Sequence, residues 1–169
     1  MKTNMIRTVV AIAAWGTATI GLAADAISHG DKEFLKDASE LGLTEVQMGK
    51  LAAEKATDPN LKALGSKMMA DHNVSNSDVI KIAAAKGVEL KMDETSTQKK
   101  MLSSFEGKTG AEFDKEFREH AVKDHEKTIK LFKHAAETSP DADIKAFAVK
   151  NLPILQEHLA MASGTAASH

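Results

Sequence analysis

The chain has 169 residues, of which 43% are hydrophobic and 27% are charged, with a formal net charge of −2 at pH 7. This balance is typical of a soluble globular protein and excludes a disordered or membrane-embedded chain. Interspersed basic and acidic residues and few aromatics exclude a nucleic-acid-binding surface, and the lack of cysteine excludes disulfides and a cysteine-linked lipid.

The amino-terminal segment is typical of a secretory signal peptide. Two basic residues precede the stretch VVAIAAWGTATIGLA, which is too short and too rich in small residues to span a membrane. Cleavage is predicted after Ala23, with cleavage after Ala26 as the alternative. We therefore expect residues 1–23 to be removed and residues 24–169 to form one domain without a membrane span. The predicted location is the periplasm or the exterior of a bacterium.

The remaining chain is predicted to be helical, because Ala, Leu, Lys, Glu and Met dominate nearly every segment and strand signals are scarce. A first helix is expected over about 31–56, where apolar residues recur at spacings of three, four and seven. A second helix should begin after the break TDPNL, with Asp58 as its N-cap and Pro59 in its first turn. It should end at Gly87.

A polar crossover follows the second helix and can include a short helix at about 95–105. The third long helix is expected over 110–137, where apolar residues again follow the helical period. Glu112 stands three positions after Thr109, and this spacing predicts a capping box at the start of the third long helix.

A fourth long helix should follow the break TSPDAD and run to about Met161, with Pro153 as an internal kink. The junction before it repeats an earlier one, since AAETSPDADIKAF (135–147) aligns without gaps on AAEKATDPNLKAL (52–64). Two related hairpins joined by one longer crossover predict an all-α, ferritin-like four-helix bundle with its core at about 31–162.

One polar residue interrupts the apolar stripe of each long helix. In chain order these residues are Glu45, His72, His125 and His158. A buried polar side chain without a partner costs about 1–3 kcal/mol, so four such residues should satisfy one another or share a ligand. One carboxylate and three imidazoles form a metal-ligand set that zinc, copper, iron and manganese all accept.

The helical rise, counted from each turn, predicts which of these residues lie at the same level. Glu45 and His72 lie nearly level, on either side of the turn at residues 57–58. Across the second turn, near residue 139, His158 lies level with His120 instead of His125. His120 and the nearby Asp124 are therefore alternative ligands.

Three stretches carry a family resemblance: EVQMGKLAAEKATDPNLKALGSKMMADH, EFDKEFREHAVKDHEKTIKLF and IKAFAVKNLPILQEHLAMA. On these the chain resembles the DUF4142 family of exported bacterial proteins, which look like a divergent branch of the ferritin-like bundles. The resemblance implies a helical bundle and the recurrence of Glu45 and the three histidines, and it supplies no activity.

The chain departs from the di-iron pattern of ferritin-like proteins, which use Glu-x-x-His pairs on two helices. Met69, Val122 and Leu155 stand three residues before the histidines. A mononuclear site, or none, is therefore expected in place of a carboxylate-rich di-iron centre.

These patterns lead to two functional hypotheses. The first is an exported metal-binding bundle, with a role in metal handling or oxidative-stress defence. The alternative is a metal-free structural or interaction module, in which the same residues form a buried hydrogen-bond network. The sequence has no Gly-rich phosphate loop and no Ser-His-Asp pattern, so no catalytic residue is assigned.

Overall fold

The computed structural model describes residues 27–165, so the predicted signal peptide and its cleavage sites lie outside the described residues. Over 27–165 the protein is all-α, with five helices and no strand, and the predicted fold class is confirmed at this level. The helices are α1 (His29–Lys55), α2 (Pro59–Ala85), α3 (Ser96–Glu106), α4 (Gly110–Thr138) and α5 (Ala142–Ser163).

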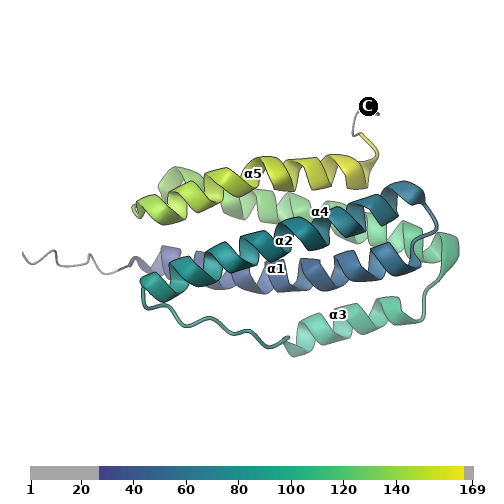
Figure 1. Cartoon of the computed structure of the whole chain (residues 1–169), viewed down its shortest axis with the longest axis horizontal. Helices are drawn as coiled ribbons and strands as arrows, with labels where there is room; N and C mark the ends of the chain where they lie inside the picture. Colours follow the sequence, from purple (N-terminus) through teal and green to yellow (C-terminus); the bar gives the residue numbers. More distant parts are fainter. Residues whose placement is uncertain (1–26, 166–169) are drawn as a thin grey trace, which may run out of the picture.

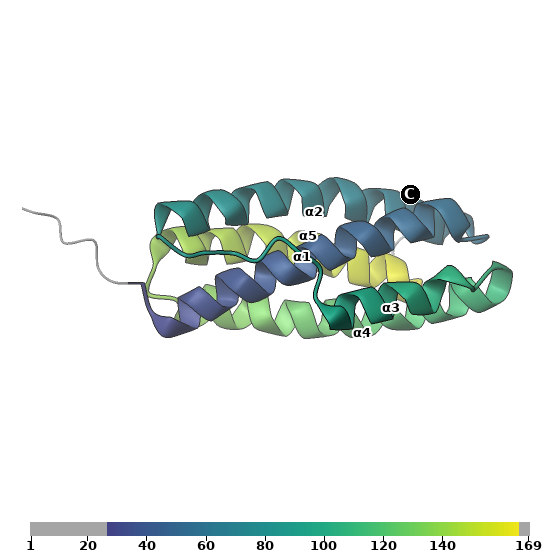
Figure 2. The same ribbon diagram turned by 90° about the horizontal axis from the view of Figure 1, so that it is seen from below.

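The four long helices run side by side along the long axis of the molecule, and the short helix α3 lies outside them (Figures 1 and 2). Helix α1 packs along α2, and α4 packs along α5, while α2 faces α5 and α1 faces α4. Helix α3 is the short helix predicted in the crossover. It is held against α1 by the Gln98 side chain, whose amide nitrogen lies 2.9 Å from the Glu40 carbonyl oxygen.

The ends of α2 follow the sequence prediction. The Asp58 side chain accepts a hydrogen bond of 2.8 Å from the Asn60 N–H, and Pro59 begins the helix. Beyond the last turn, Gly87 adopts a φ of +66°, a left-handed conformation that glycine reaches without steric cost. Within residues 27–165 no helix has both the length and the apolar character needed to cross a membrane.

The predicted capping box at the start of α4 is wrong. Thr109 precedes the helix, but its side chain makes no capping hydrogen bond. Gly110 has a φ of +59°, so the chain turns at this residue and the Thr109 hydroxyl does not meet the amides of the first turn. The capping box of this region is in α3, where Thr95 and Gln98 exchange both hydrogen bonds.

The core consists of two apolar clusters separated by a polar layer. One cluster includes Phe34, Leu35, Val79, Phe132, Ile144 and Phe147. The other includes Met48, Leu61, Leu64, Met68, Phe113 and Phe117. In the layer between them each long helix contributes a buried polar side chain: Glu45, His72, His125 and His158. All four residues are buried, as their place in the apolar stripes predicts.

Helices α1 and α2 approach each other closely at Gly49 and Gly65. A Cβ added at Gly65 would lie 2.5 Å from the Gly49 carbonyl oxygen and 2.7 Å from the Ala53 nitrogen, so backbone would have to move. We therefore expect Gly65→Ala to lower the free energy of unfolding by about 1–3 kcal/mol, measured by urea denaturation. Gly→Ala in an open helix position usually stabilises by about 0.5–1 kcal/mol.

The matched control is Gly30→Ala in α1, where the nearest atom to an added Cβ is the Ser28 Oγ at 3.9 Å. This variant should keep or raise the stability of the wild type. Equal stability of the two variants would contradict the close approach of α1 and α2.

Candidate metal centre

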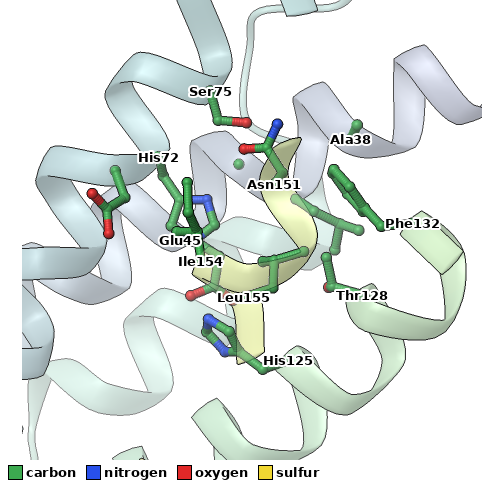
Figure 3. A pocket seen from close by; sticks show the side chains of 13 residues that line it. Ala38, Glu45, His72, Ser75, His125, Thr128, Phe132, Asn151, Ile154 and Leu155 are labelled. Atoms are coloured by element: carbon green, nitrogen blue, oxygen red, sulfur yellow. The ribbon is translucent and has the colours of Figure 1, made fainter. Parts of the chain in front are cut away.

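Three histidines from three helices meet in the polar layer. His72 lies on α2, His125 on α4 and His158 on α5, and their exposed fractions are 6%, 1% and 0%. One ring nitrogen from each histidine can be chosen so that all three atoms lie within 4.8 Å of one another. Figure 3 shows His72 and His125 directed into a common space beside Glu45.

The prediction that His158 lies beside His120 is wrong, because His158 contacts His125 instead. The Nδ1 atom of His158 lies 3.3 Å from the Nε2 atom of His125. The prediction counted the rise of the backbone alone, whereas helical side chains lean toward the amino terminus of their own helix. In an antiparallel hairpin this lean moves His158 toward the turn and His125 away from it, which closes the offset.

The outer ring nitrogens of this pair have oxygen partners. The Nδ1 of His125 lies 2.9 Å from the carbonyl oxygen of Ala121, one turn earlier in α4. The Nε2 of His158 lies 2.9 Å from a carboxylate oxygen of Asp71 on α2. Each of these two contacts requires a proton on the nitrogen, because the partner can only accept.

Asp71 is the residue of this site that sequence reasoning missed. Its carboxylate contacts His158, and it also forms an ion pair of 3.2 Å with Lys67. Burial pushes the pKa of Asp71 up, but the hydrogen bonds from His158 and Lys67 outweigh it, so the pKa lies below its usual value. No signal within α2 identifies this residue, because its spacing to Lys67 is also that of an ordinary surface ion pair.

Burial keeps the three imidazoles neutral at neutral pH. It lowers the pKa of His72 to about 3, with repulsion from the other two histidines adding to the effect. It lowers the pKa of His125 to about 4 in the same way. The pKa of His158 is also lowered by burial, although the hydrogen bond to Asp71 opposes the shift. Neutral imidazole is the form that binds metals.

Glu45 lies at the edge of the histidine cluster. It is 2% exposed, and neither of its carboxylate oxygens has a hydrogen-bond partner. Burial raises the pKa of Glu45 well above its usual value, and the carboxylate of Asp124 adds to the shift. With His72 and His125 it lines a cavity of about 10 Å³, shown in Figure 3. It does not belong to the group of three whose ligand atoms converge.

The alternative ligands His120 and Asp124 are not part of this cluster. They line a groove between α1, α3 and α4, on the outer side of the polar layer. The His120 ring contacts Phe105 edge-on, with the ring centroids 5.7 Å apart, and its Nε2 is buried without a hydrogen-bond partner. The structure therefore brings together the three inward histidines, leaves His120 outside, and places Asp124 near Glu45 without making it a member of the group.

The fold and this site define an all-α protein with a buried cluster of three histidines. The chain belongs to the family described as Domain of unknown function (DUF4142), whose sequence model matches residues 17–164. The family resemblance drawn from the sequence is thereby confirmed. No curated protein and no solved structure matches the chain.

Proposed function

We propose that this protein is an exported bacterial protein that holds one transition-metal ion between His72, His125 and His158. Export rests on the signal-peptide character of the amino-terminal segment. Metal handling or defence against oxidative stress is the role that such a site would serve. The proposal depends on one observation, the contact between His125 and His158.

In this proposal the fold is a ferritin-like four-helix bundle. Helices α1 and α2 form one hairpin, α4 and α5 form the other, and the crossover that contains α3 joins them. Metal sites in such bundles are built in the core from side chains on facing helices. The polar layer between the two apolar clusters occupies the place in the core where such bundles hold their metal ions.

The contacts of the His125–His158 pair require one positive charge more than two neutral rings supply. Three contacts are made, to Ala121, between the rings and to Asp71, and each needs one proton. Two neutral imidazoles carry only two protons. With the outer nitrogens protonated, two lone pairs face each other across 3.3 Å. A cation between the rings stabilises this arrangement.

The distance between the two inner nitrogens favours a metal ion as that cation. Two nitrogens bound at about 2.0–2.1 Å to a tetrahedral ion lie about 3.3–3.4 Å apart. The observed separation is 3.3 Å. The Nε2 of His72, which is buried without a partner, supplies the third ligand atom. A set of three imidazoles suits zinc, copper and iron better than manganese.

The alternative is a metal-free structural or interaction module, in which an extra proton takes the place of the metal. One shared proton would also satisfy all three contacts of the His125–His158 pair. Burial opposes this proton, since it lowers the pKa of His125 to about 4. A proton also leaves the His72 Nε2 without a partner.

The deciding experiment is the metal content of protein purified without a histidine tag, followed by titration of the chelated protein with Zn²⁺ and Cu²⁺. We expect one ion per chain, and at least tenfold weaker binding by His125→Ala, because one of the protein ligands is lost. The control His134→Ala removes an exposed histidine of the same helix. A metal-free native protein that also fails to bind added ions would refute the proposal.

Asp71 should set the metal affinity through His158. Its hydrogen bond to Nε2 fixes the tautomer that leaves Nδ1 free to bind the ion. We expect Asp71→Ala to weaken metal binding about 10–100-fold, the usual cost of losing such a partner. The matched control is Asp78→Ala, on the same helix α2 as Asp71. It breaks an ion pair with Lys150 of α5. Unchanged affinity of the Asp71 variant, measured by competition with a chelator, would exclude this role.

A further inference from the structure

We propose that the coordination position left open by the three histidines is filled by one water molecule, which Glu45 and Thr128 hold in place. The site then admits a single small oxygen ligand and no larger substrate. This inference rests on the proposed metal site and adds the identity of the fourth ligand.

Glu45 is placed to act through a bridging ligand. The ligand atoms of one ion lie at most about 4.2 Å apart, twice a bond of about 2.1 Å. The three histidine nitrogens form a group within 4.8 Å of one another, and Glu45 is not a fourth member. Its carboxyl group nevertheless lines the same cavity as His72 and His125. A water molecule bound to the ion would link it to Glu45 by a hydrogen bond.

The cavity has the size and the polar lining of a water site. Its volume is about 10 Å³, which is about one probe sphere and so room for a single water. A buried water needs two to four polar partners. Both Glu45 oxygens and the Thr128 hydroxyl are buried without partners, and both side chains line the cavity. The ion, Glu45 and Thr128 would together give the water three partners.

The wall of the cavity on the side of one apolar cluster excludes larger ligands. Ala38, Phe132 and Leu155 close it on the side of one apolar cluster. Figure 3 shows Phe132 and Leu155 beside Thr128 at this end of the cavity. A ligand much larger than water would have to displace these side chains from a packed core, which is unfavourable.

The test uses Cu²⁺-loaded protein in ¹⁷O-labelled water, measured by electron–nuclear double resonance. We expect a coupling from a directly bound water oxygen in the wild type and in Glu45→Gln, because the amide keeps the volume and a hydrogen-bonding group. Glu45→Leu should lose or change this coupling, since leucine fills the cavity with apolar atoms. The control Glu40→Gln, on the same helix but not among the cavity residues, should resemble the wild type.

The affinities for Cu²⁺ separate the remaining outcomes. With water as the ligand, Glu45→Gln should bind Cu²⁺ within about threefold of the wild type. No ¹⁷O coupling in the wild type, together with at least tenfold weaker binding by Glu45→Gln, would make Glu45 itself the ligand and overturn the inference. A coupling unchanged in Glu45→Leu would remove Glu45 from the site. Failure of the wild type to bind Cu²⁺ would refute the metal site itself.

Discussion

Zinc added to the chelated wild-type protein is expected to raise its midpoint of thermal unfolding by about 5–10 °C at a free concentration of 100 times Kd. A ligand that binds only the folded state stabilises it by about 2.7 kcal/mol under these conditions. In a chain of about this length, each kcal/mol moves the midpoint by about 2–4 °C. Differential scanning calorimetry with zinc and with chelator measures the shift.

His72→Ala separates the metal site from a hydrogen-bond network. If His72 is a ligand, the variant binds zinc at least tenfold more weakly, and the stabilisation at the same zinc concentration falls by about 1.4 kcal/mol. If His72 were only a hydrogen-bond partner, its loss would cost about 1–3 kcal/mol with or without zinc. The ligand outcome is expected because its Nε2 has no hydrogen-bond partner.

The exposed His134 provides the control for this experiment. His134→Ala should keep the full zinc-dependent shift, because this residue lies outside the polar layer. A wild-type midpoint that neither zinc nor chelator moves would contradict the metal site. The polar layer would then serve to fix how the helices align.

The inward positions of the polar residues were predictable from the sequence, because helical periodicity alone determines which face a residue occupies. Glu45 and His72 sit at positions where the apolar stripe demands a core residue, and both are buried. The same reasoning predicted the ends of α2 from Asp58 and Gly87, since capping depends on neighbouring residues only.

Contacts between helices were less predictable, because they depend on the direction of side chains and on how the helices pack. The alignment of His125 with His158 depends on the lean of both side chains, which the count of backbone rise ignores. Asp71 was missed because its spacing to Lys67 is also that of an ordinary surface ion pair. Its contact with His158 joins α2 to α5, and no periodicity within one helix reveals such a partner.

The second large effect is expected from pH, because the metal-free protein should lose stability as the pH falls below about 6.5. The pKa of His72 is about 3 and that of His125 about 4 in the folded protein, against about 6.5 in an unfolded chain. Between these values the unfolded state binds more protons, so stability falls with falling pH. Each histidine contributes a slope of up to about 1.4 kcal/mol per pH unit.

Glu45 acts in the opposite direction over the same range. Its pKa in the folded protein is raised well above 4.5, so the folded state holds a proton that the unfolded state releases. Stability from this residue is therefore gained as the pH falls toward 4.5, with a slope of up to about 1.4 kcal/mol per pH unit. The pKa of His158 is lowered too, so the buried histidines together outweigh Glu45 and a net loss of stability remains as the pH falls.

Two variants, each replacing one ionisable side chain with uncharged glutamine, separate these opposing contributions between pH 6 and pH 5. Glu45→Gln removes the opposing carboxyl group, so its loss of stability should be steeper than that of the wild type by up to about 1.4 kcal/mol per pH unit. His72→Gln removes one histidine, so its loss of stability should be shallower than that of the wild type by up to about 1.4 kcal/mol per pH unit in this range. Urea unfolding with chelator at each pH measures the slopes. Equal slopes in the wild type and both variants would mean that neither His72 nor Glu45 changes its protonation on folding, contrary to their burial in the polar layer.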